Sequence, residues 1–177
     1  MSLVWETASF KTNVLIKNII GKELINDDNV AVMELVKNSY DAGASKVEIE
    51  FKNIFNGDES FAQGIEDINN KTSQIIIKDD GKGMSKEDIL NKWLNIAYSS
   101  KKTEQTQNDR YQAGNKGVGR FSCDRLGEFL NIYTRIENQN IIHLQINWKD
   151  FELIDQINTQ IQDIPINIRE LNNTEFK

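Results

Sequence analysis

Three polar residues share one face of a predicted helix. Glu34, Asn38 and Asp41 are spaced i, i+4 and i+7, so at 3.6 residues per turn they lie along one stripe. A carboxylate in such a stripe can take a proton from an attacking water. An amide oxygen one turn away can complete the shell of Mg²⁺, a hard cation that keeps waters and phosphate oxygens. A solvated helix face has the same pattern, so the meaning of the stripe depends on its neighbours.

A second polar segment follows a short apolar strand. It begins with Asp79 and contains Gly81, Gly83 and Met84. Glycine lets the backbone turn tightly and approach a flat ligand closely, and a carboxylate fixed at a strand end can accept a hydrogen bond from an exocyclic amine such as that of adenine. Because Asp-Gly is a common turn dipeptide, an ordinary strand-to-helix turn is the alternative interpretation.

A third segment is rich in glycine. Gly114, Gly117 and Gly119 precede a helix predicted to begin near Arg120. Free N–H groups at a helix start and a glycine loop together make an anion site for phosphates, and Lys116 and Arg120 add positive charge. The spacing G-x-x-G-x-G differs from the dinucleotide fingerprint, and the chain has no G-x-x-x-x-G-K-[ST]. A plain helix start is the alternative.

Helices and strands must position these segments. Asp27 or Asp28 can cap a helix over 29–41, with Gly43 just past its end. Residues 45–52 alternate between apolar and charged, which predicts a half-buried strand with its apolar side chains toward a core. The other predicted elements are a strand at 74–78, a helix over 85–97 that starts with a capping box, a helix from 117–119 to 127, and strands at 130–135 and 141–148.

Two stretches have weaker patterns. Residues 98–116 are polar and lack periodicity, which suggests a mobile lid. Near the end of the chain, Ile154, Ile157 and Ile161 fit a helix, while a second set of isoleucines alternates like a strand; that set is Ile164, Ile166 and Ile168.

Composition restricts the class of protein. The chain has 177 residues, of which 38% are hydrophobic and 27% charged, so we expect one globular domain. A net charge of -6 argues against a nucleic-acid surface. The single cysteine, Cys123, and the single histidine, His143, are interpreted as structural residues, and they argue against a structural zinc site. A lone cysteine cannot form a disulfide within the chain, which favours a cytoplasmic location. No signal peptide or membrane-length apolar run is visible.

In order and spacing, the three segments resemble the GHKL superfamily of ATP-binding domains: gyrase B, the ninety-kilodalton heat-shock chaperone, sensor histidine kinases and MutL. The resemblance covers about residues 10–148. Residues 34–44 look most like MutL and the chaperone, and 79–84 and 117–122 resemble the chaperone's two glycine boxes. The implied fold class is α+β: a two-layer α/β sandwich (Bergerat fold) with a mixed, mostly antiparallel sheet and helices on one face. Residues 1–177 would form a single ATP-binding domain.

The resemblance implies a role for each matching side chain. Glu34 would be the catalytic base that activates water, Asn38 would ligate Mg²⁺, and Asp41 would line the pocket beside the sugar and base. Asp79 would bind the adenine amine. Residues in the turn that follows would flank the base; these are Gly81, Gly83 and Met84.

The phosphates would be bound by the third segment. Backbone N–H groups would come from Gly117, Val118, Gly119, Arg120 and Phe121. Lys101 lies in the expected lid, near a place where family members often carry a phosphate-contacting lysine. The family usually completes its sheet with a Gly-Thr strand that touches the adenine. No equivalent precedes Lys177, so we expect the domain to end short of its last strands.

The leading hypothesis is an Mg²⁺-dependent ATPase, the N-terminal domain of a chaperone-like or MutL-like protein with ATP-driven lid closure and dimerisation. It rests on Glu34, because sensor kinases generally place an asparagine there. The alternatives are the catalytic domain of a sensor histidine kinase, which transfers phosphate to a partner histidine, and a non-hydrolysing ATP-gated interaction module. ATP and Mg²⁺ are the expected cofactors; neither nucleic acid nor a membrane is indicated as a partner, and we expect weak turnover from this chain alone.

Overall fold

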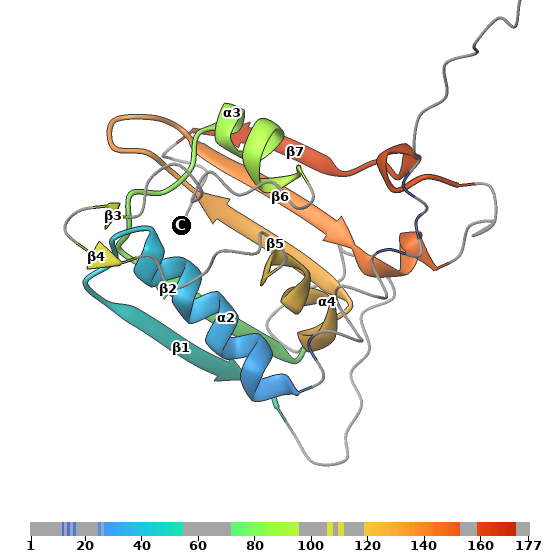
Figure 1. Ribbon diagram of the computed structural model, residues 1–177, viewed down its shortest axis with the longest axis horizontal. Coiled ribbons are helices and arrows are strands. Elements are labelled where there is room, and N and C mark those ends of the chain that lie inside the picture. Colours follow the sequence, from blue (N-terminus) through green and yellow to red (C-terminus); the bar gives the residue numbers. More distant parts are fainter. Residues whose placement is uncertain are drawn as a thin grey trace, which may run out of the picture.

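The computed structural model describes residues 12, 14, 16, 25, 27–54, 72–95, 106–107, 110–111, 119–152 and 159–172. These residues form helices and antiparallel strands, which confirms the α+β class (Figure 1). The elements are α2 (Asp28–Asp41), β1 (Val47–Lys52), β2 (Gln74–Asp79), α3 (Lys86–Asp88), the π-helix η3 (Ile89–Trp93), β3 (Thr106–Gln107), β4 (Arg110–Tyr111), the 3-10 helix η5 (Gly119–Phe121), α4 (Ser122–Leu126), β5 (Phe129–Thr134), β6 (Ile141–Asn147), the 3-10 helices η6 (Trp148–Phe151) and η7 (Ile161–Asp163), and β7 (Asn167–Leu171). No helix in these residues is long and apolar enough to cross a membrane.

The strands pair in an antiparallel way throughout the described part of the chain. β1 pairs with β2, β3 with β4, and β5, β6 and β7 form a three-stranded sheet in that order. Helix α2 lies in front of β2 in Figure 1, with β1 running alongside, and α4 lies beside β5. An ion pair of 2.6 Å between Asp28 Oδ1 and Arg125 Nε joins the start of α2 to α4.

The core lies against one face of β6. Alternate residues of this strand, Ile142, Leu144 and Ile146, are buried there with Ile89 from η3 and Phe121 from η5. The rest of the buried cluster is Val14, Trp148, Phe151 and Ile164. Strand β6 is the middle strand of its sheet, and η3 and η5 are held in the same core by the apolar contacts of Ile89 and Phe121.

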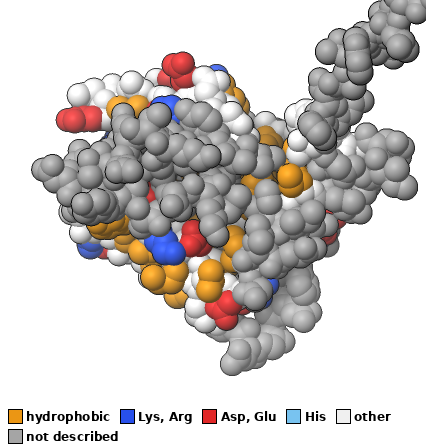
Figure 2. All heavy atoms as spheres, in the orientation of Figure 1, with side chains coloured by type: hydrophobic (Ala, Val, Ile, Leu, Met, Phe, Trp, Pro, Cys, Tyr) orange, Lys and Arg blue, Asp and Glu red, His pale blue; other side chains and the backbone are white. Residues whose placement is uncertain are grey.

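The predicted strand at 45–52 forms as β1, but its apolar face is not buried as expected. Ile49 is 41% exposed and Phe51 is 60% exposed. The reason is the position of α2, which contacts β2, α4 and η5 more than it contacts β1. Its outward face is also apolar, with Val30 at 45%, Met33 at 54% and Tyr40 at 41% exposure. Figure 2 shows hydrophobic side chains between charged ones on this side of the molecule.

The helix predicted over 85–97 is different in form. It begins with the expected capping box: Ser85 Oγ accepts from Asp88 N at 3.0 Å, and the Asp88 carboxylate accepts from Ser85 N at 3.0 Å. The chain then widens into the π-helix η3, where Leu94 N donates to Ile89 O at 2.8 Å. Ile89 is fully buried, whereas Leu90 is 47% exposed. Residues 96–97 lie outside the described part.

The second half of the chain largely agrees with prediction. The strands expected at 130–135 and 141–148 are β5 and β6. The strand interpretation of the last isoleucines holds only for Ile168, which lies in β7 and pairs with β6, whereas Ile164 and Ile166 pack against the core before the strand begins. Ile161, from the helical alternative, lies in the 3-10 helix η7. Most of the expected lid, 98–116, lies outside the described residues, but β3 and β4 form a short pair within it that the sequence did not predict.

Candidate functional site

Helix α2 presents the polar stripe. Asp27 caps it, with Oδ1 accepting from Asn29 N at 2.8 Å and Val30 N at 3.2 Å. Because the helix is regular from residue 28 to residue 41, the i, i+4, i+7 spacing places Glu34, Asn38 and Asp41 along one face. The Glu34 side chain is 28% exposed, and Asn38 is exposed.

The first and third segments meet at Gly119. A Cβ atom on Gly119 would lie 3.0 Å from Glu34 Oε2 and 3.9 Å from Asn38 Nδ2. Any larger residue would therefore occupy the space beside both polar groups. This glycine leaves the backbone of η5 open next to a carboxylate and an amide, which is an arrangement suited to phosphate and its metal ion.

The second segment joins the site through Asp79. Ser39 on α2 is buried, and its Oγ donates to Asp79 Oδ2 at 2.9 Å, while Gly81 N donates to Asp79 Oδ1 at 2.9 Å. These bonds fix the carboxylate at the end of β2. Asp79 itself is exposed, and each carboxylate oxygen has a further lone pair, so the group can accept another hydrogen bond from a ligand.

The turn after Asp79 is clamped between α2 and β5. Lys82 N donates to Ala42 O at 3.0 Å, and Met84 N donates to Thr134 Oγ1 at 2.8 Å. Gly83 has a φ of +69°, and a Cβ on it would lie 2.0 Å from Arg135 O. Only glycine fits this backbone, because both the left-handed φ and the carbonyl contact exclude a side chain.

Asp80 has a role that sequence reasoning missed. Its Oδ1 accepts from Ser45 N at 2.7 Å and from Lys46 N at 2.9 Å, and its Oδ2 accepts from Ser45 Oγ. The hydrogen bond from the Ser45 hydroxyl contributes most, and that from the Lys46 amide second, to lowering the pKa of Asp80 to about 2. The signal was available: successive strand residues face opposite ways, so Asp79 and Asp80 cannot both face α2.

Comparison with known proteins gives these segments a family. Residues 26–176 match the family described as histidine kinase-, DNA gyrase B-, and HSP90-like ATPase, which is most of the chain. The chain belongs to this family. The GHKL resemblance expected from the three segments is thus confirmed.

Individual relatives point to two branches of the GHKL family. The mitochondrial TNF receptor-associated protein 1 homolog of Dictyostelium discoideum is 31% identical over 149 residues, covering 73% of this chain and 19% of that protein. The chaperone protein HtpG of Aliivibrio fischeri is 28% identical over 143 residues, covering 73% of this chain and 22% of that protein. The DNA mismatch repair protein MutL of Thermosipho africanus is 38% identical over 84 residues, covering 45% of this chain and 12% of that protein. The chain therefore spans less than a quarter of each relative.

Several expected ligand contacts in this GHKL domain cannot be placed. Lys101, Gly117 and Val118 lie outside the described residues. Arg120 lies in η5, where only its backbone is described. The Phe121 ring is in the core, 6.2 Å from the Trp148 ring, so this residue can face a ligand only with its backbone.

The cysteine and the histidine behave as structural residues. Cys123 packs against the core, and burial raises the pKa of its thiol to about 12. His143 is 1% exposed. Arg169 Nε donates to His143 Nδ1 at 3.1 Å, so Nε2 carries the proton that it shares with Asn131 Oδ1 at 2.9 Å. Tyr133 stacks on the ring with centroids 4.1 Å apart.

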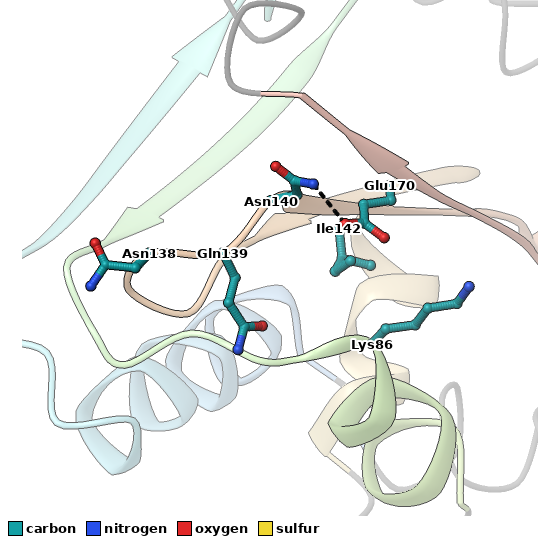
Figure 3. Close-up of a pocket in the computed structure, with 6 residues that line it drawn as sticks. All are labelled: Lys86, Asn138, Gln139, Asn140, Ile142 and Glu170. Carbon is teal, nitrogen blue, oxygen red and sulfur yellow. Dashed lines mark hydrogen bonds between the residues drawn. The ribbon is translucent and has the colours of Figure 1, made fainter.

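A cavity of about 350 Å³ is lined by residues outside the three segments, although one of them, Lys86, lies only two residues past the second segment (Figure 3). Its walls come from the start of α3, the turn between β5 and β6, β6 itself through Ile142, and β7. In Figure 3 the amide of Asn140 points toward Glu170, and Nδ2 donates to Oε1 at 2.8 Å. The cavity contains none of the predicted site residues, so it has no part in the nucleotide hypothesis.

Proposed function

We propose that this chain is the ATP-binding, Mg²⁺-dependent ATP-hydrolysing domain of a chaperone-like or MutL-like protein. The observation that carries the proposal is the meeting of Glu34 and Asn38 with Gly119. This contact brings a candidate base and a candidate metal ligand from α2 to the glycine segment expected to bind phosphate. A solvated helix face, the alternative for α2, does not require a glycine at that contact.

Each residue has one task in this proposal. Glu34 accepts a proton from the attacking water as general base. The amide oxygen of Asn38 holds Mg²⁺, which supplies positive charge against the phosphate oxygens when bound. The backbone of η5 offers N–H groups to the phosphates.

The adenine end of the ligand is assigned to Asp79. Ser39 and Gly81 already hold its two oxygens in place, so the carboxylate can accept the adenine amine without reorganising. The clamped backbone at Gly83 and Met84 would lie beside the base, and Asp41 would line the pocket near the sugar. Preorganisation of this kind favours binding, because little freedom is lost when the ligand arrives.

Closure of the 98–116 segment over ATP and dimerisation in the whole protein complete the proposal. Both are supported by likeness to HtpG and MutL, and a cytoplasmic location stays a prediction. Sedimentation with and without a non-hydrolysable ATP analogue tests the assembly. We expect a larger species with the analogue, and an unchanged sedimentation coefficient would argue against an ATP-gated dimer.

Phosphate release tests the hydrolytic role. Glu34→Gln should lower kcat by about 100-fold or more, because a general base contributes on the order of 10² to 10⁴ in rate, while ATP affinity in calorimetry stays within about threefold. Glu48→Gln on β1 is the matched control and should leave both values unchanged. Full turnover by Glu34→Gln would reject the role of the base. Labelled phosphate that appears on a partner histidine instead of in solution would favour the histidine-kinase alternative.

A further inference from the structure

We propose that Lys37 is a positioning residue for the Glu34 carboxylate; this inference rests on the proposed function. Lys37 Nζ donates to Glu34 Oε1 at 2.7 Å, one helical turn along α2. The other oxygen, Oε2, is the one that faces Gly119. The two oxygens of one carboxylate thus have different partners: a lysine on one side and the glycine segment on the other.

The position of Lys37 on the helix explains why it acts through Glu34. Lys37 lies between Met33 and Tyr40 along the outward face of α2, about 100° around the helix from Asn38. Its ammonium turns back to reach Glu34 and does not belong to the stripe that meets Gly119. The pair is partly screened from water, with side-chain exposures of 41% for Lys37 and 28% for Glu34, so it is held more firmly than a fully solvated pair.

Fixing one carboxylate oxygen matters for a general base. The base must present an oxygen within hydrogen-bond reach of the attacking water, and a glutamate side chain rotates freely unless something restrains it. Lys37 restrains Oε1 and so keeps Oε2 directed at the glycine segment. Loss of this restraint should reduce the rate of the chemical step and leave nucleotide binding intact.

The test compares Lys37→Met with Lys37→Arg. Methionine keeps most of the side-chain length but removes the charge, and arginine retains it. A misplaced catalytic group can cost up to about 100-fold in rate. Because Lys37→Met loosens Glu34 without removing it, we expect a smaller loss, with kcat lowered by about three- to tenfold. Its Kd for a non-hydrolysable ATP analogue should stay within about twofold, and Lys37→Arg should recover most of the lost rate. Lys46→Met, which breaks the Lys46–Glu48 pair on β1, is the matched control and should be neutral.

A double-mutant cycle separates this inference from the proposed function. In a Glu34→Gln background, Lys37→Met should cause no further loss, because its only route of action is gone. Wild-type kcat in Lys37→Met, together with loss of activity in Glu34→Gln, would overturn the positioning role and leave the proposed function standing. Weakened analogue binding in Lys37→Met would also overturn it, since Lys37 would then contact the nucleotide. Equal turnover, or none, in wild type and Glu34→Gln would refute the proposed function and this inference with it.

Discussion

Gly83→Ala tests how firmly the turn after β2 is held. Gly83 lies between α2 and β5, with a φ of +69°. A Cβ there would lie 2.0 Å from Arg135 O and 2.7 Å from Arg135 C. Both contacts are to backbone atoms of the chain just past β5, so no side-chain rotation can relieve them.

The expected cost has two parts. An alanine in the left-handed region costs about 1–2 kcal/mol. Carbon and oxygen atoms normally approach no closer than about 3.3 Å, so the turn or the end of β5 must move by more than about 1 Å, and overpacking of this kind costs about 1–3 kcal/mol. The sum is about 2–5 kcal/mol, a large share of the free energy of unfolding of about 5–15 kcal/mol that is typical of a domain.

Urea unfolding followed by circular dichroism measures this loss, provided that the slope with denaturant is the same for both proteins. Gly127→Ala is the control. Gly127 has an extended φ of -173°, and a Cβ there would be 3.8 Å from its nearest neighbour, Phe129 O, so its unfolding free energy should change by less than about 1 kcal/mol. If Gly83→Ala cost no more than Gly127→Ala, the turn would not be clamped as described.

Two further predictions concern nucleotide affinity and pH. Asp79→Asn should abolish ATP binding in calorimetry, because an amide nitrogen facing the adenine amine leaves the hydrogen-bond pair incomplete; unchanged affinity would refute the adenine assignment. Burial lowers the pKa of His143, and the charge of Arg169 lowers it further. The unfolded chain therefore binds a proton at higher pH than the folded chain, so the free energy of unfolding should decline as the pH falls below about 6.5. In urea titrations, His143→Gln should remove that decline. Asp80 acts at lower pH. Because its pKa is lowered to about 2, the ionised carboxylate stabilises the fold above about pH 4, and this stabilisation is lost as the pH falls through about 2. Asp80→Asn should remove this pH dependence.

Local signals were sufficient for several elements. The cap at Asp27, helix α2, the left-handed Gly43 with φ of +81° and the capping box at Ser85 depend on residues within one or two turns of each other. Strands β5 and β6 were predicted from their own runs of apolar residues, although burial does not alternate along either strand. Each of these features is decided before distant parts of the chain meet.

The departures from prediction depend on distant contacts. Alternation in β1 was read correctly as a strand, but how much of it is covered depends on where α2 packs, and no residue within β1 encodes that. Local periodicity predicted an ordinary helix where the π-helix η3 forms, with Ile89 buried in the core beside residues of β6. The candidate site residues were named from their types and spacing and stay a prediction, whereas the contact of Gly119 with Glu34 required α2 and η5 to be placed in space.

The clamp on the second segment also orders events during synthesis. The hydrogen bond from Met84 N to Thr134 Oγ1 joins residues 50 apart in sequence, and the Asp28–Arg125 pair joins residues 97 apart. When β1 and β2 leave the ribosome, the chain that holds their final turn has not yet been made, and such long loops close late. A nascent chain should therefore lack the finished turn at Gly83 and Met84 until β5 emerges.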